Sequence, residues 1–111
     1  MELTRLTHNL VVRSQVMPEE ISGLAAAGFK SIINNRPDGE APDQPSSQAL
    51  EAEAKRHGLT YWHIPIVPGQ ATEENARAFA AALSRTEGPV VAFCRTGNRS
   101  TSLWKIAQQT S

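Results

Sequence analysis

The feature that most constrains this chain is a regular alternation of strand-like and helix-like segments. The clearest strand is the compact apolar run at 89–93, a pattern typical of a strand covered on both faces. Segments with helical spacing separate the strand-like runs, and parallel strands need such crossovers between them. The sequence therefore predicts an α/β fold in which helices flank a small, mostly parallel sheet.

Capping and turn residues give the boundaries of these elements. The predicted order is an edge strand at 10–12, a helix at 18–28, a strand at 30–34, a loop at 35–44, a helix from Ser46 or Ser47 to His57, a strand at 59–64, a helix after Thr72, a strand at 89–93 and a helix from about Arg99 to Gln108. No internal repeat or low-complexity linker interrupts this order. We therefore expect one domain over residues 1–111.

Composition excludes several classes of protein. The 111 residues are 40% hydrophobic with a net charge of zero, which predicts a packed core and argues against a general nucleic-acid binder. No apolar run approaches the roughly 18 residues of a spanning helix, and residues 1–7 do not form a signal peptide. We therefore expect a cytoplasmic protein without a membrane partner. The three histidines are unclustered, so we expect no metal and no other cofactor.

Two counts point to the second half of the chain. Cys94 is the single cysteine, which excludes an internal disulfide. Residues 1–55 hold five basic and eight acidic side chains, whereas residues 56–111 hold six basic and three acidic ones. The second half is therefore the better place for an anion to bind.

The most unusual residues follow the strand at 89–93. Cys94 comes directly after it, and Arg99 stands where the last helix is expected to begin. Ligands of parallel sheets gather at such carboxyl ends and helix N-termini, where backbone N–H groups converge on anions. We predict that Cys94 and Arg99 are catalytic. The predicted anion-binding loop consists of Arg95, Thr96, Gly97, Asn98 and Ser100.

The same positive field would act on the thiol. A free cysteine titrates near 8.5, and helix N-termini or nearby cations lower that value by up to several units. We therefore predict a nucleophilic thiolate at Cys94. Ser100 would either donate its hydroxyl to the sulfur or brace the loop. Alone, a cysteine at the end of an apolar strand is more often a small buried hydrophobe, but Gly97, Arg99 and the helix start favour the nucleophile.

The loop at 35–44 contains both aspartates of the chain. The strand at 30–34 would run parallel to the one at 89–93, so this loop would leave the sheet at the same edge as Cys94. Arg36 would then add positive potential at the rim of the site, and Asp38 or Glu40 would serve as an acid or hold the catalytic loop. The alternative is purely structural, because Pro-Asp-Gly is a good turn sequence.

The motif Cys-x-x-Gly-x-Arg-Ser resembles the active loops of protein tyrosine phosphatases and of rhodaneses. Over residues 21–105 the chain more closely resembles the phosphatase-like domain of beta-lactamase-hydrolase-like proteins, which are also described as sulfur transferases. The resemblance is carried by residues 25–40, 63–69 and 93–100. It implies a dual-specificity-phosphatase-like fold, with Cys94 as the nucleophile and Arg99 as the oxyanion-binding arginine. It also implies a sulfur dioxygenase domain as a partner, since family members are often fused to one.

Two observations favour sulfur transfer over phosphate hydrolysis. Four residues separate Cys94 from Arg99, whereas tyrosine phosphatases have five, and a smaller ring of amides suits a persulfide better than a phosphoryl group. Phosphatases of this kind also need an aspartic acid to protonate the leaving group, yet residues 66–70 contain no carboxylate. The sequence thus predicts a rhodanese-type sulfurtransferase, with a phosphatase acting through a phosphocysteine as the alternative.

In the predicted reaction the Cys94 thiolate takes the sulfane sulfur of a small anionic donor such as thiosulfate. The resulting persulfide passes its sulfur to an external thiol, because the chain has no second cysteine. Two non-catalytic functions also stay open. One is an oxyanion-binding module, and the other is a redox sensor built on the oxidisable thiolate.

Overall fold

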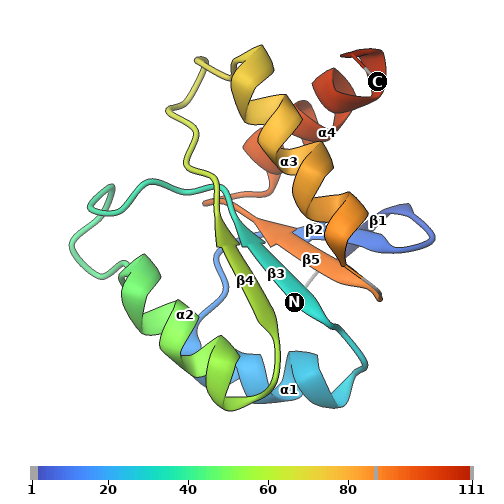
Figure 1. Ribbon diagram of the computed structural model, residues 1–111. Coiled ribbons are helices and arrows are strands. Elements are labelled where there is room, and N and C mark those ends of the chain that lie inside the picture. Colours follow the sequence, from blue (N-terminus) through green and yellow to red (C-terminus); the bar gives the residue numbers. More distant parts are fainter. Residues whose placement is uncertain (1–2, 87, 111) are drawn as a thin grey trace.

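The computed structural model describes residues 3–86 and 88–110 as a five-stranded sheet with helices on both faces (Figure 1). The strands are β1 (Thr4–Thr7), β2 (Leu10–Arg13), β3 (Ser31–Asn34), β4 (Thr60–His63) and β5 (Val90–Phe93), in the spatial order β1-β2-β5-β3-β4. Only the β1–β2 pair is antiparallel. The predicted α/β fold with a mostly parallel sheet is confirmed.

The helices divide between the two faces of the sheet. They are η1, a 3-10 turn (Pro18–Glu20), α1 (Ile21–Ala26), α2 (Ser47–Arg56), α3 (Glu73–Arg85) and α4 (Asn98–Thr110). In Figure 1, α1 and α2 cover one face and α3 and α4 cover the other. Ser46 and Thr72 cap α2 and α3 with their side chains, as their sequence positions predict.

The central strand β5 explains why residues 89–93 form an unbroken apolar run. All four of its residues are buried. Val90 and Ala92 belong to the core cluster beneath α3 and α4, and Val91 and Phe93 belong to the cluster beneath α1 and α2. Because each face of this strand meets a helical layer, neither set of side chains can be polar.

The first third of the chain differs from the sequence-based prediction. Residues 10–12 were expected to form an edge strand, but β2 is buried and lies between β1 and β5. The edge is β1, which the sequence did not predict because its residues are mostly polar and exposed. The helix expected at 18–28 is a 3-10 turn followed by only six helical residues.

The parallel register brings three loops to one edge of the sheet. Asn34, the last residue of β3, pairs with Phe93 on one side and with His63 on the other. The segments that follow β3, β4 and β5 therefore begin side by side. Residues 35–46, 64–72 and 94–97 form this edge, and the site lies there.

None of the helices within residues 3–86 and 88–110 has the length and hydropathy of a membrane-spanning segment.

A core substitution tests the packing of α3 on the sheet. Phe79 has no exposed surface, so Phe79→Ala removes a full aromatic ring and should lower the free energy of unfolding by about 3–5 kcal/mol. Urea denaturation measures this loss. The control is Arg77→Ala, because the Arg77 side chain on the same helix is 76% exposed, and it should change the value by less than about 0.5 kcal/mol. A similar small effect for both variants would contradict the packing described here.

Candidate active site

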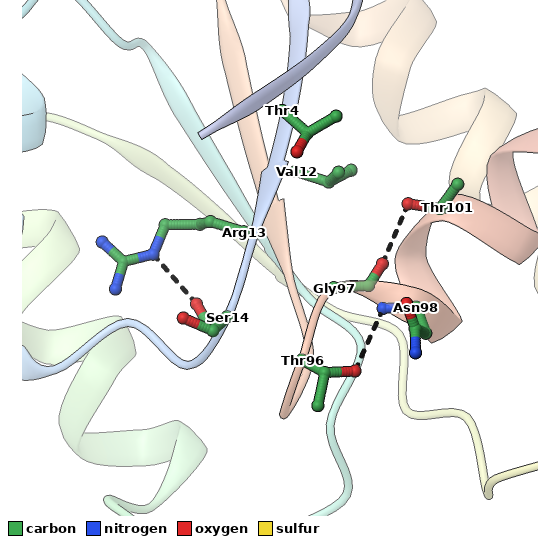
Figure 2. A pocket seen from close by; sticks show the side chains of 8 residues that line it. All are labelled: Thr4, Val12, Arg13, Ser14, Thr96, Gly97, Asn98 and Thr101. Atoms are coloured by element: carbon green, nitrogen blue, oxygen red, sulfur yellow. Dashed lines mark hydrogen bonds between the residues drawn. The ribbon is translucent and has the colours of Figure 1, made fainter. Parts of the chain in front are cut away.

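The loop between β5 and α4 is held closely against the end of β2. Gly97 has φ +97°, and a Cβ at this position would lie 3.4 Å from the carbonyl oxygen of Arg13. Figure 2 shows this side of the loop, where Gly97 faces the Arg13 backbone while the Arg13 side chain turns away. A Cβ would thus be in ordinary contact with β2, and it is the positive φ that makes glycine the favoured residue here.

Hydrogen bonds between residues that are close in the sequence fix the shape of the loop (Figure 2). The Asn98 N–H donates to Thr96 Oγ1 over 3.3 Å, and Thr101 Oγ1 donates to the Gly97 carbonyl over 2.9 Å. The cleft on this side has a volume of about 210 Å³. Its lining residues are Thr4, Val12, Arg13, Ser14, Thr96, Gly97, Asn98 and Thr101.

Cys94 lies buried at the centre of the loop. The Gly97 N–H donates to its sulfur over 3.0 Å. Burial opposes ionisation of the thiol, but hydrogen bonds from the backbone N–H groups of Ser100, Thr96, Arg99 and Gly97 outweigh it and lower the pKa of Cys94 below its ordinary range. The loop and the first turn of α4 thus favour the thiolate, as the sequence predicts.

Arg99 is held above the loop by two partners. Its Nη1 and Nη2 atoms donate to the two carboxylate oxygens of Glu40 over 2.7 and 2.8 Å, and Nη1 also donates to the Ile66 carbonyl over 2.9 Å. Glu40 raises the pKa of Arg99, and proximity to Cys94 adds to the effect. A guanidinium has five N–H groups, so the three bonds leave two N–H groups for the sulfur and for an oxyanion.

Glu40 is bound by two arginines. Besides its paired bonds with Arg99, it accepts a bond from Arg36 Nε over 2.9 Å. The Arg99 hydrogen bond is the largest influence on Glu40, and with Arg36 it lowers the pKa of Glu40 to about 2 despite partial burial. The carboxylate is therefore ionised at neutral pH. An ionised Glu40 has no proton to donate, and its contacts match the other role that the sequence analysis allowed, because it holds Arg99 in place.

The other two candidates of the rim have structural partners. The Asp38 carboxylate accepts a bond from the Ser47 backbone N–H over 2.8 Å and so binds the N-terminus of α2. Arg36 is buried, and its charge is matched by Glu40 while its Nη1 donates to Gln15 Oε1. Arg36 thus supports Glu40, and its charge does not face an entering anion.

Ser100 braces the loop through a residue that the sequence analysis missed. Its hydroxyl donates to Asn35 Oδ1 over 2.7 Å, so it does not donate to the sulfur. Asn35 has no exposed surface, and its Nδ2 donates to the Ile64 carbonyl over 2.9 Å. One amide therefore joins all three loops at this edge. The sequence signal was the pair Asn34-Asn35 where an apolar strand ends, since two buried amides need partners there.

The remaining loop residues differ in exposure. Thr96 and Asn98 are exposed and bond to each other, whereas Arg95 is exposed and projects beside the loop. Within residues 3–86 and 88–110, no three His, Cys, Asp or Glu side chains are grouped in a way that could hold a metal ion.

In this site the cysteine follows a buried parallel strand, backbone N–H groups surround its sulfur, and an arginine lies beside it. This arrangement is typical of phosphatase-like α/β domains with a cysteine nucleophile. Sequence comparison places the chain more narrowly. It belongs to the family described as "Beta-lactamase hydrolase-like protein, phosphatase-like domain", whose sequence model matches residues 2–111. The resemblance stated from the sequence is confirmed.

Individual relatives support this assignment. The Beta-lactamase hydrolase-like protein of Xylella fastidiosa Temecula1 is 36% identical over 108 residues, which cover 97% of this chain and 25% of that protein. This chain therefore spans about a quarter of the length of the curated relatives it matches. A proposed phosphatase from Neisseria meningitidis Z2491 superposes with a TM-score of 0.83 at 31% identity, covering 90% of this chain and 71% of the other.

The fold extends to more distant phosphatases. The catalytic core of a PP-IP phosphatase from Saccharomyces cerevisiae has a TM-score of 0.67 at 16% identity, over 91% of this chain and 60% of the other. At this identity the match concerns the fold alone. Together, the comparisons support an enzyme of the phosphatase-like class, which was the alternative in the sequence analysis, and they do not support its main prediction of a rhodanese-type sulfurtransferase.

Ionisation of Cys94 can be measured directly because the chain has one cysteine. The ultraviolet absorbance of the thiolate, taken as the difference between the protein and its Cys94→Ser variant, should show a midpoint below the value of about 8.5 for free cysteine. Burial of the sulfur does not affect this readout, whereas it would slow alkylation. A midpoint at or above that of free cysteine would contradict the described ring of N–H donors.

The Glu40 contacts predict an acid-dependent contribution to stability. The folded pKa of about 2 lies below the ordinary value of 4.5, so the carboxylate stabilises the fold above about pH 4.5 and loses this effect as the pH falls toward 2. Glu40→Gln should therefore lower the free energy of unfolding by on the order of 1 kcal/mol at pH 7. The difference should shrink below pH 4 in urea titrations.

The matched control for this pH dependence is Glu73→Gln, since the Glu73 side chain is 72% exposed and its ion pair with Arg77 is long at 3.5 Å. It should have little effect at either pH. If Glu40→Gln were as stable as the unsubstituted protein at pH 7, the two-arginine contact would not stabilise the fold.

Proposed function

We propose that this domain is a cysteine-dependent phosphatase that acts through a phosphocysteine at Cys94. The observation that carries the proposal is the convergence of backbone N–H groups on a buried sulfur, with the Arg99 guanidinium beside it. The phosphatase-like family and fold support this reaction more directly than they support sulfur transfer. The Neisseria relative at 31% identity is itself a proposed phosphatase.

The reaction has two displacement steps. The Cys94 thiolate attacks phosphorus, an S–P bond forms, and the P–O bond to the leaving group breaks with its electron pair on oxygen. Water then attacks phosphorus, the S–P bond breaks, and inorganic phosphate leaves while the thiolate is restored. The loop N–H groups and the Arg99 N–H group that does not face the sulfur would stabilise negative charge on the phosphoryl oxygens in both steps.

The site lacks a protonated acid for the first step. Glu40 is ionised by its two arginines, and Asp38 binds the N-terminus of α2. A leaving group that departs without a proton is therefore the better substrate, because no described carboxyl group is placed to donate one. We infer that the domain prefers phosphate esters of acidic alcohols such as phenols over esters of ordinary alcohols.

Sulfur transfer is the second candidate, and the missing acid is the observation that favours it. The Cys94 thiolate would attack the outer sulfur of thiosulfate, the S–S bond would break, and sulfite would leave as a stable anion. An external thiolate or cyanide would then remove the outer sulfur and restore Cys94. The spacing of four residues between Cys94 and Arg99 also favours this reaction, since a persulfide needs a smaller loop.

Two parallel assays separate the candidates. The purified protein should release phosphate from 4-nitrophenyl phosphate, and Cys94→Ser should reduce kcat about a thousandfold or more, because serine at neutral pH is not ionised in this loop. Arg99→Lys should reduce kcat/KM by roughly a hundredfold, since lysine lacks the planar fork that faces Glu40 and the oxyanion together. Arg85→Lys, on the far end of α3, serves as the control.

One result would favour sulfur transfer over phosphate hydrolysis. Formation of thiocyanate from thiosulfate and cyanide, together with a mass gain of one sulfur atom on Cys94 and no phosphate release, would establish sulfur transfer. In that case the acceptor in the cell has to be an external thiol, because the chain offers no second cysteine. A sulfur dioxygenase domain as partner belongs to the same proposal.

A further inference from the structure

A groove of about 600 Å³ adjoins the candidate active site and is not used by the chemistry described above. It lies between the loop after β4, the catalytic loop and the side of α4. Its lining includes Pro68 and Ala71 from the segment after β4, Arg95 from the catalytic loop, and Arg99 and Ile106 from α4. Arg99 lines this groove and also belongs to the site at Cys94, so the groove adjoins that site.

The groove differs in character from the cleft on the β2 side of the loop (Figure 2). That cleft has about a third of the volume and is lined largely by polar groups of β2, the loop and α4. The groove has apolar side chains from two elements, Pro68 and Ala71 from the segment after β4 and Ile106 from α4. Such a surface suits the organic part of a small molecule, with a few polar groups to orient it.

The two arginines of the groove differ in whether a carboxylate of the protein pairs with them. Arg99 is engaged by Glu40 and by the Ile66 carbonyl. Arg95 is exposed, and among residues 3–86 and 88–110 no carboxylate lies within ion-pair distance of it. Its guanidinium is therefore a cation without a protein counter-charge in a groove with apolar side chains, an arrangement that suits a second anionic group on the ligand.

We propose that this groove binds the non-reacting part of the substrate and selects organic molecules that carry a second anionic group opposite Arg95. This inference rests on the proposed function, because it takes the reacting oxyanion to lie at Cys94 and Arg99. The ligand class is an organic phosphate whose apolar body lies against Pro68 and Ala71 and whose second negative charge, a carboxylate or a phosphate, pairs with Arg95. Arg95 is thus a specificity residue.

Binding to the Cys94→Ser protein tests the inference without requiring turnover. The probes are 4-nitrophenyl phosphate and 3-carboxy-4-nitrophenyl phosphate, which share the aryl phosphate and differ by one carboxylate. Calorimetric titration should give a Kd for the carboxylated probe about fivefold lower, a difference of the size expected for a partly exposed ion pair. Adding Arg95→Gln should bring the ratio of the two Kd values close to one, and Arg95→Lys should restore part of it.

Arg85→Gln is the matched control, because Arg85 is an exposed arginine at the end of α3 and does not line the groove. It should leave the ratio of Kd values unchanged. Equal Kd values for the two probes would overturn the inference. So would a preference that survives Arg95→Gln or that falls equally with Arg85→Gln.

The same probes keep this inference distinct from the proposed function. If the unsubstituted protein hydrolyses both phosphates without preference and the two Kd values are equal, the phosphatase stands and the groove assignment fails. If it hydrolyses neither while the Cys94→Ser protein still prefers the carboxylated probe, the phosphatase fails and the groove remains a site for organic phosphates that carry a second anionic group. A bisphosphate probe in place of the carboxylate shows which second anion Arg95 prefers.

Discussion

The parallel register of β3, β4 and β5 is the constraint on which the site depends. The last residues of these strands, Asn34, His63 and Phe93, pair with one another across the sheet. Three loops that are distant in the sequence therefore begin on neighbouring strands. The Asn35 amide then joins them, since it bonds to Ser100 in α4 and to the Ile64 carbonyl after β4. Without this common edge, neither Glu40 nor the Ile66 carbonyl could reach Arg99.

Charge balance at this edge is local. Glu40 lies between Arg36 and Arg99, which leaves the group of three with one net positive charge. Arg36 is buried and is also bound to Gln15, so it acts as a fixed support for the carboxylate. Arg99 is the more exposed of the two arginines, and it also interacts with the sulfur of Cys94. The result is a site that attracts an anion while its arginine is already oriented.

The sequence was most informative where chemistry and local pattern coincide. The apolar run at 89–93 predicts a strand covered on both faces, and the following Cys94, Gly97 and Arg99 predict an anion-binding loop before a helix. These elements lie where expected, because short-range signals such as strand patterning and glycine in a turn decide them. Strand β1 escaped prediction because a polar four-residue strand has no pattern that distinguishes it from a loop.

The roles of the loop after β3 could not be read in the same way. Glu40 and Arg99 are 59 residues apart, and nothing local to either one indicates the pairing. Asp38 and Glu40 are both acidic and only two residues apart, yet one binds the α2 N-terminus and the other binds Arg99. The folded path of the loop decides which of the two carboxylates reaches α2 and which reaches Arg99. The Asn35 contacts were hidden for the same reason.

The buried position of Cys94 has a consequence for damage and its repair. The thiolate is the form of cysteine that peroxides oxidise, and its first product, a sulfenic acid, returns to the thiol only through reaction with another thiol. This chain has no second cysteine, so the rescuing thiol has to come from outside and pass Arg99 and the loop to reach the sulfur. Repair of an oxidised Cys94 therefore depends on a thiol that another molecule supplies.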